Sequence, residues 1–133
     1  MRSILLVLTL ALATPIAAAP QSPAAEDRLI GAWAGTYDGE SMGQYTMSFA
    51  RDGSGPVKGT LEVMPDGGTG YSVPFKSIVV KEASVTLAYD SPEAQGVEVQ
   101  LDGTLEGASL AGTWKVTEAG ATVSTGTFAG TKK

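Results

Sequence analysis

Short segments in which apolar and polar residues alternate constrain the fold of this chain more than any other feature. Tyr45, Met47 and Phe49 alternate with the polar residues Gln44, Thr46 and Ser48, and a similar alternation recurs in residues 60–63 and 84–89. A period of two residues over such a length indicates a strand with one buried face. The pattern predicts eight strands, near residues 31–38, 43–51, 57–65, 71–80, 83–90, 96–102, 108–117 and 121–131.

Turn signals separate the predicted strands. They are Asp38-Gly39, Asp52-Gly53-Ser54-Gly55, Asp66-Gly67-Gly68, Ser91-Pro92-Glu93, Asp102-Gly103 and Glu118-Ala119-Gly120. Connections this short make sequence neighbours pair in an antiparallel meander. Closing the meander removes both exposed edges, whereas a two-sheet sandwich, the alternative, usually has longer connections. We therefore predict an all-β fold, an eight-stranded antiparallel up-and-down β-barrel preceded by a signal peptide.

Both tryptophans occur in Gly-x-Trp settings, at Gly31-Ala32-Trp33 and Gly112-Thr113-Trp114. Glycine weakens a strand unless another group must approach the backbone closely, so we expect these glycines to make room for the indoles. The first and seventh strands become next-but-one neighbours if the last strand pairs with the first. The residues expected to face inward are Trp33, Tyr37, Tyr45, Met47, Phe49, Leu61, Val63, Val73, Phe75, Val79, Val85, Leu87, Tyr89, Val97, Val99, Leu101, Leu110, Trp114, Val116, Val123 and Phe128.

The N-terminal residues have the order of a secretory signal peptide. Arg2 precedes an apolar run, and sequence rich in alanine and proline follows. We assign residues 1–24 to the signal peptide, with cleavage between positions 18 and 25, residues 25–30 to an N-terminal arm and residues 31–133 to the barrel. The expected location is secreted or periplasmic, with no membrane anchor after removal of the leader. Abundant alanine and glycine with no asparagine suggest a bacterial source with a GC-rich genome.

The composition narrows the function classes. Removal of Arg2 with the leader leaves eight basic and fourteen acidic side chains, a net charge of −6, so we expect no nucleic-acid partner. The chain has no cysteine and no histidine. Histidine-dependent triads are therefore excluded, and zinc sites without both residue types are very unusual. We predict no metal and no cofactor.

Other catalytic arrangements have simpler explanations. Ser72 and Lys76 are four residues apart, as are Ser77 and Lys81, but such spacing is common by chance. Among the carboxylates that could serve a glycosidase, Glu62, Glu98 and Asp102 fall on outward positions, where a solvated surface explains them. The Asp-Gly pairs lack the ligand spacing of calcium loops. We predict that the protein is not an enzyme, and an enzyme using carboxylates is the less favoured alternative.

The first-strand Gly-x-Trp followed by a meander resembles the calycin group, which contains lipocalins and avidins. Four repeated phrases are similar to small accessory barrels found ahead of secreted bacterial α/β-hydrolases: Gly59-Thr60-Leu61, Gly103-Thr104-Leu105, Gly112-Thr113-Trp114 and Gly126-Thr127-Phe128. The resemblance spans residues 31–131 and implies a lipocalin-like barrel. It departs from lipocalins at residues 86–90, where threonine, tyrosine and aspartate have a different order from the lipocalin Thr-Asp-Tyr.

Binding is the function that these exclusions leave, and we expect a monomeric binding module. The expected structural core includes Trp33, Trp114, Phe49 and Phe75. One end of the barrel should be packed solid, and the other should be at most a shallow cup lined by tyrosines. Four tyrosines near strand ends, whose hydroxyls could reach water or a small apolar ligand, are Tyr37, Tyr45, Tyr71 and Tyr89. Core packing with only the hydroxyl tips in water also explains these tyrosines, and we favour it over a ligand site.

A secreted protein partner is the alternative ligand. The protein would then be an inhibitor of, or accessory to, a secreted hydrolase or protease. The candidate contact surfaces are the arm, residues 20–30, and the loops at residues 66–70 and 91–95.

Overall fold

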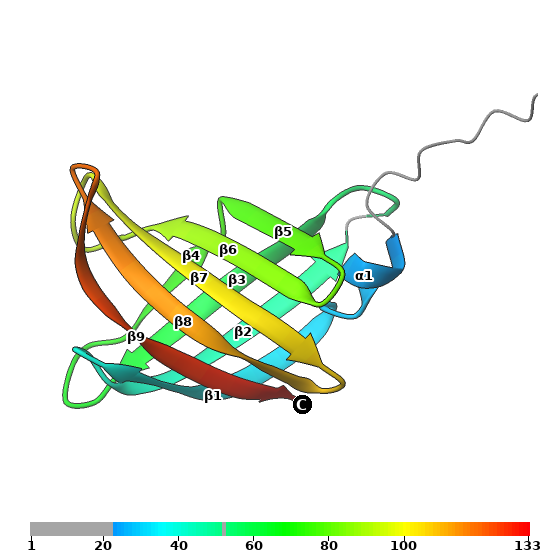
Figure 1. Cartoon of the computed structure of the whole chain (residues 1–133), viewed down its shortest axis with the longest axis horizontal. Coiled ribbons are helices and arrows are strands. Elements are labelled where there is room, and N and C mark those ends of the chain that lie inside the picture. The colour runs from blue at the N-terminus through cyan, green and yellow to red at the C-terminus, as the bar shows by residue number, and fades with distance from the viewer. Residues whose placement is uncertain (1–22, 52) are drawn as a thin grey trace, which may run out of the picture.

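The computed structural model describes residues 23–51 and 53–133, so the predicted signal peptide lies almost wholly outside the described residues. One short helix precedes nine strands (Figure 1). They are α1 (Pro23–Asp27), β1 (Gly31–Gly39), β2 (Gly43–Arg51), β3 (Val57–Pro65), β4 (Tyr71–Pro74), β5 (Ser77–Lys81), β6 (Ser84–Asp90), β7 (Val97–Glu106), β8 (Ser109–Glu118) and β9 (Ala121–Lys132).

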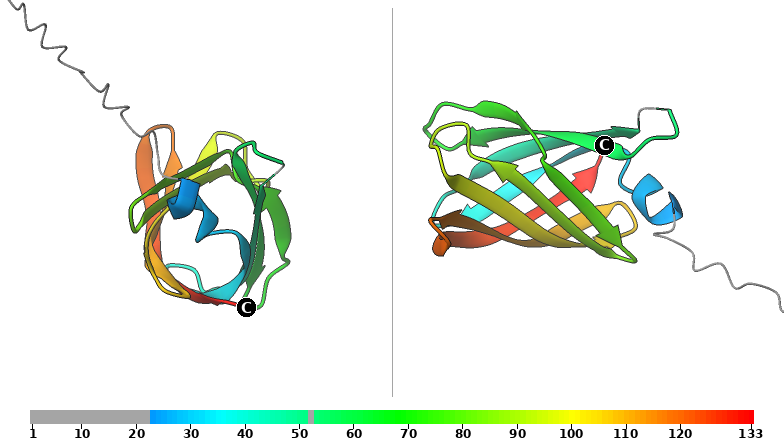
Figure 2. Two further views of the ribbon diagram at one scale, coloured as in Figure 1. Left: turned by 90° about the vertical axis from the view of Figure 1, so that its right-hand side faces the viewer. Right: turned by 90° about the horizontal axis from the view of Figure 1, so that it is seen from above.

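All nine strands form one antiparallel sheet in the order β4-β3-β2-β1-β9-β8-β7-β6-β5. The sheet curls into a barrel-like shape, and an end view shows the strands arranged around a central space (Figure 2). The predicted pairing of the first and last strands is confirmed, since Trp33 of β1 lies opposite Lys132 of β9. The single sheet rules out the sandwich.

Strands β4 and β5 are the two edges of this sheet, and only Phe75 and Lys76 separate them along the chain. The amide of Phe75 donates to the carbonyl oxygen of Gly59 on β3, whereas the amide of Lys76 donates to that of Ala88 on β6. The segment predicted as one strand at residues 71–80 is therefore two strands, each paired with a different neighbour. The barrel-like sheet has nine strands and not eight.

The break at residues 75–76 also changes which side chains face inward. Val79, predicted to face inward, is 41% exposed, whereas Val80 is buried and Ile78 packs against the core. Val123 is likewise outside, at 51% exposure, because it is the extra residue of a bulge: Val116 pairs with Ser124, but Thr117 pairs with Thr122. Such an insertion interrupts the alternation of faces.

One further prediction was wrong. Asp102-Gly103 is not a turn but lies within β7, paired with β8, and the chain instead turns at residues 107–108. The short helix α1, which the sequence pattern does not indicate, forms in the polar segment before β1. No helix of the described residues has the length and apolar character needed to span a membrane.

Helix α1 and the turn after it lie across one end of the barrel (Figure 2), which we call the α1 end. Leu29 is fully buried, and its carbonyl oxygen accepts a hydrogen bond of 2.8 Å from the indole N–H of Trp33. Arg51 forms ion pairs with Glu26 and Asp27 of the helix, at 3.2 and 3.0 Å. The N-terminal segment, which the sequence predicts as a contact arm, therefore packs against this end of the barrel.

Candidate functional site: a tyrosine-lined cavity

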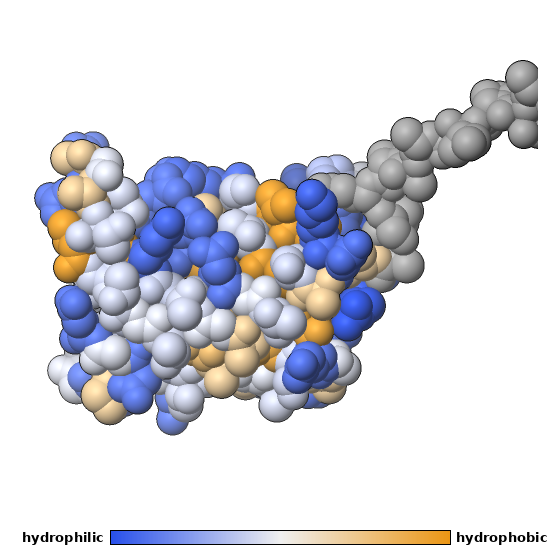
Figure 3. Space-filling model, in the orientation of Figure 1, coloured by the Kyte–Doolittle hydropathy of each residue, from blue (hydrophilic) through white to orange (hydrophobic). Residues whose placement is uncertain are grey.

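Four connections surround the opposite end of the barrel, which we call the cavity end: residues 40–42, 66–70, 91–96 and 119–120. The pairing dictates this grouping, because paired neighbours are antiparallel and β4 and β5 both run away from the cavity end. Both predicted partner loops, residues 66–70 and 91–95, therefore lie here, and the described residues 23–30 of the predicted arm lie at the α1 end. Across the exterior seen in Figure 3, hydrophilic and neutral residues predominate.

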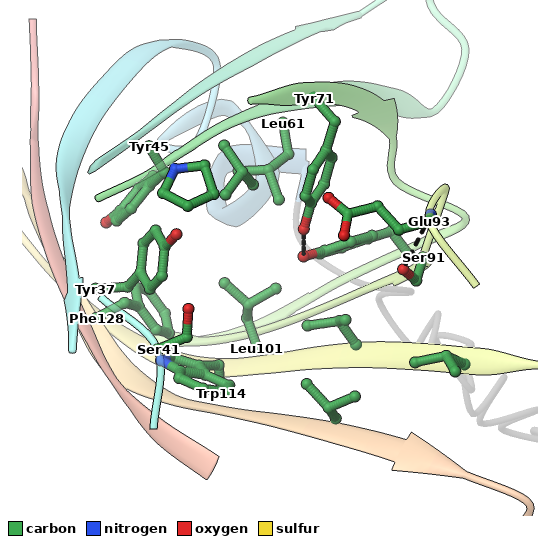
Figure 4. Close-up of a pocket in the computed structure, with 16 residues that line it drawn as sticks. Tyr37, Ser41, Tyr45, Leu61, Tyr71, Ser91, Glu93, Leu101, Trp114 and Phe128 are labelled. Atoms are coloured by element: carbon green, nitrogen blue, oxygen red, sulfur yellow. Dashed lines mark hydrogen bonds between the residues drawn. The ribbon is translucent and has the colours of Figure 1, made fainter. Parts of the chain in front are cut away.

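A cavity of about 240 Å³ lies inside the sheet at this end (Figure 4). A dry cavity of about 150 Å³ can hold one benzene molecule, so the volume is sufficient for an aromatic ring with a short chain. Its lining residues are Tyr37, Ser41, Tyr45, Leu61, Val63, Pro65, Tyr71, Tyr89, Ser91, Glu93, Val97, Val99, Leu101, Trp114, Val116 and Phe128. Most of these are apolar or aromatic, which is typical of small-molecule sites.

The structure brings together all four tyrosines that the sequence suggested. Tyr71 and Tyr89 form one side of the cavity, and their hydroxyl oxygens are 2.9 Å apart in a hydrogen bond (Figure 4). Burial raises the pKa of Tyr71 and of Tyr89 above the ordinary tyrosine value. Both phenols are therefore neutral at physiological pH, where they can donate or accept hydrogen bonds.

Tyr37 and Trp114 form the facing side (Figure 4). Their rings meet edge to face at a centroid distance of 6.4 Å. The indole of Trp114 lies across β9 over Gly126, where a Cβ atom would overlap the ring. Its N–H is already bonded to the carbonyl oxygens of Asp38 and Thr127, so Trp114 offers the cavity an apolar surface and no free donor.

The glycines make room for aromatic rings, but mostly not in the expected pairs. Gly126, on the strand beside Trp114, accommodates that indole, whereas Gly112 abuts the β7 backbone at Asp102 and Gly103. Gly31 adjoins the side chain of Lys132 and not the indole of Trp33, and Gly35 lies near the hydroxyl of Tyr45. Gly59 lies under Phe49 and Phe75, whose rings stack at a centroid distance of 5.6 Å.

Tyr45 differs from the other three tyrosines. Its hydroxyl is buried and has no hydrogen-bond partner among the described residues. The oxygen lies near Gly35 and Gly130, and in Figure 4 it points away from the centre of the cavity. Burial raises the pKa of Tyr45 to about 12. The ring of this residue lines the cavity, but its hydroxyl is directed toward the wall.

Glu93 contributes the cavity lining's one charged side chain. It comes from the loop after β6, and its carboxylate is turned toward Tyr71 (Figure 4). Negative charge from Glu93 contributes to the raised pKa values of Tyr37, Tyr71 and Tyr89, after the larger effect of burial. Sequence reasoning placed this loop on a partner surface and missed its contribution to the cavity, as it missed Ser41 and Ser91.

The candidate catalytic groups lie elsewhere. Lys76 is on the outside, where its ammonium contacts Asp90 at 2.8 Å and Glu98 at 2.7 Å. The hydrogen bonds that the ammonium donates to these carboxylates raise the pKa of Lys76, which opposes the neutral form that a serine–lysine mechanism requires. Glu62 and Asp102 are exposed on outward positions. No group of three or more acidic residues in the described part of the chain is arranged to hold a metal ion.

Comparisons with known proteins support the fold. No family model matches the chain, and no curated protein matches it. Among solved structures, the crystal structure of Rv2717c from M. tuberculosis is similar, with a TM-score of 0.53, 13% sequence identity and coverage of 86% of this chain and 99% of that chain. A likeness at this identity shows a shared barrel-like fold, and the calycin resemblance stays a prediction.

Proposed function

We propose that the protein is an exported, non-catalytic binding module that holds a small, mainly apolar molecule at the cavity end of its barrel. The observation that carries the proposal is the 240 Å³ cavity between the Tyr37–Trp114 side and the Tyr71–Tyr89 side. Aromatic walls provide apolar contact, and the tyrosine hydroxyls provide a few oriented polar groups. Export is proposed from the order of residues in the N-terminal segment alone.

The packing at the two ends of the barrel supports a binding site that is already formed before a ligand binds. At the α1 end, Leu29 and Trp33 are buried and hydrogen-bonded to each other. The fold therefore has a packed core that does not need a ligand for its stability. Gly126 lets the indole of Trp114 lie close to the sheet wall and not across the cavity. A preformed cavity loses little conformational entropy when it binds its ligand.

Native mass spectrometry of the protein purified from the cells that naturally make it tests this proposal. We expect a retained small molecule, and a Val116→Phe variant should lose it because the new ring fills part of the cavity. Val123→Phe is the matched control, since it adds the same ring on the exposed outer face. Retention of the same molecule by Val116→Phe at full occupancy would contradict a site inside the barrel.

A protein partner is the second candidate, and one observation favours it. Met42 and Met64, which are 53% and 40% exposed, both lie at the cavity end, where the predicted partner loops also lie. Exposed methionines adapt readily to different surfaces. Affinity purification from the periplasm or medium with Met42→Ser/Met64→Ser as control tests this alternative, and recovery of the same proteins by both forms would contradict it.

A further inference from the structure

The charge of the cavity lining restricts which small molecules the site can accept. None of the lining residues is a lysine or arginine, and Glu93 supplies a carboxylate at the mouth. By contrast, the carboxylates of Glu26, Asp27, Asp90 and Glu98 are each paired with Arg51 or Lys76. No described residue forms an ion pair or a hydrogen bond with the carboxylate of Glu93.

The aromatic rings around the cavity favour a cationic ligand, as Glu93 does. The faces of tyrosine and tryptophan rings carry partial negative charge and attract cations. Tyr37, Trp114, Tyr71 and Tyr89 surround the space, with Asp66 close enough to Tyr37 to contribute to its raised pKa. An anionic headgroup, such as that of a fatty acid, would meet Glu93 and Asp66 without a compensating cation in the lining.

We propose that the cavity selects a cationic amphiphile, namely a primary or quaternary amine attached to an aromatic or short aliphatic body, with the body between the aromatic sides and the ammonium beside Glu93. This inference rests on the proposed function and specifies the chemical class of its ligand. The volume fits one aromatic ring and a chain of a few carbons. Ser41 and Ser91, which also line the cavity, offer hydroxyl oxygens to the N–H protons of a primary ammonium, whereas a quaternary ammonium would rely on Glu93 and the aromatic faces alone.

Three probes that share one body separate charge from shape. They are 4-phenylbutylamine, 4-phenylbutanol and 4-phenylbutanoate, which are respectively cationic, neutral and anionic at pH 7. Titration calorimetry in low salt should give the tightest dissociation constant for the amine, about three- to tenfold below that of the alcohol, as expected for a partly exposed ion pair with cation–π contacts. The carboxylate should bind more weakly than the alcohol.

Glu93→Gln provides the decisive variant, and Glu106→Gln is its matched control at the α1 end of β7. In Glu93→Gln the ratio of amine to alcohol affinity should fall toward one, whereas Glu106→Gln should leave the ratio unchanged. Equal binding of amine and alcohol by the native protein, or tighter binding of the carboxylate, would overturn the charge preference and leave the proposed function standing. Failure of all three probes to bind at millimolar concentration would count against both the charge preference and the proposed function.

Discussion

The indole N–H of Trp114 on β8 donates to the carbonyl oxygen of Asp38 on β1, across the intervening strand β9, at 3.2 Å. The same N–H also bonds the carbonyl oxygen of Thr127 on β9. One side chain thus links the two Gly-x-Trp strands, which lie at opposite ends of the folded sequence. The other tryptophan, Trp33, donates its indole N–H to the carbonyl oxygen of Leu29 at the α1 end, so the two indoles stabilise different parts of the barrel.

We predict that Trp33→Ala and Trp114→Ala each lower the free energy of unfolding by about 3–5 kcal/mol, because each removes a large buried ring. The two should differ in binding. Trp33 is outside the cavity lining, so its variant should keep ligand affinity under conditions where it is folded, whereas Trp114→Ala should lose affinity. Urea unfolding and ligand titration at low temperature measure both, and an unchanged unfolding midpoint for either variant would contradict its place in the core.

Gly126→Ala should destabilise the fold by about 1–3 kcal/mol or more, as overpacking does. The added Cβ would overlap the indole of Trp114 and the carbonyl oxygen of Asp38, which belongs to rigid backbone. Gly68→Ala is the matched control, because its Cβ would meet only Pro65, at 3.3 Å. Equal melting temperatures for the two variants would show that the close approach at Gly126 is not required.

Tyr45→Phe should leave the free energy of unfolding unchanged or raise it by up to about 1 kcal/mol. The change removes a buried hydroxyl that has no partner among the described residues, so the folded state loses a desolvation cost and no hydrogen bond. Tyr89→Phe is the contrasting variant, since it breaks the bond to Tyr71. Urea unfolding of both compares them, and a loss of more than about 1 kcal/mol for Tyr45→Phe would indicate a bonded hydroxyl.

Stability should fall as pH rises from about 10 toward 12. An unfolded tyrosine releases its proton near pH 10, whereas burial raises the pKa of Tyr45 to about 12 and also raises that of Tyr89. In this range the folded protein binds more protons than the unfolded chain, so each such tyrosine lowers the free energy of unfolding by up to about 1.4 kcal/mol per pH unit. Below pH 10 the contribution of each such tyrosine to the free energy of unfolding is fully present.

Urea unfolding at pH 9, 10 and 11 measures this dependence, and Tyr45→Phe isolates the contribution of one tyrosine. Its slope above pH 10 should be shallower than that of the native protein. Identical slopes would contradict the burial of a neutral Tyr45 phenol. Absorbance of tyrosinate provides an independent measure of the same ionisations.

The alternation of residues was sufficient to predict most of the sheet. Residues 43–51 and 57–65 were predicted as strands, and β2 and β3 have these bounds, because regular pairing preserves the period of two. The errors in which side chains face inward occur where pairing is irregular. The exchange of partners at Phe75–Lys76 and the bulge at Val123 depend on neighbouring strands, which a local pattern does not include.

The same distinction, between local sequence pattern and the pairing of distant segments, explains what could be predicted of the site. Tyr37, Tyr45, Tyr71 and Tyr89 were found from their places near strand ends, which is local information. Glu93 was missed because its contribution depends on how the loop after β6 folds toward Tyr71. The pairing of Gly126 with Trp114 likewise requires knowledge of the register between β8 and β9.

The most direct test of the account is to locate a bound probe by NMR. With 4-phenylbutylamine present, we predict nuclear Overhauser contacts from its ring protons to Trp114 and Tyr71, and none to Trp33 at the α1 end. Those contacts would place the ligand between the two aromatic sides of the cavity. Contacts confined to exposed residues such as Val79 and Val123, or no contacts at saturating probe, would contradict the claim that this cavity is the binding site.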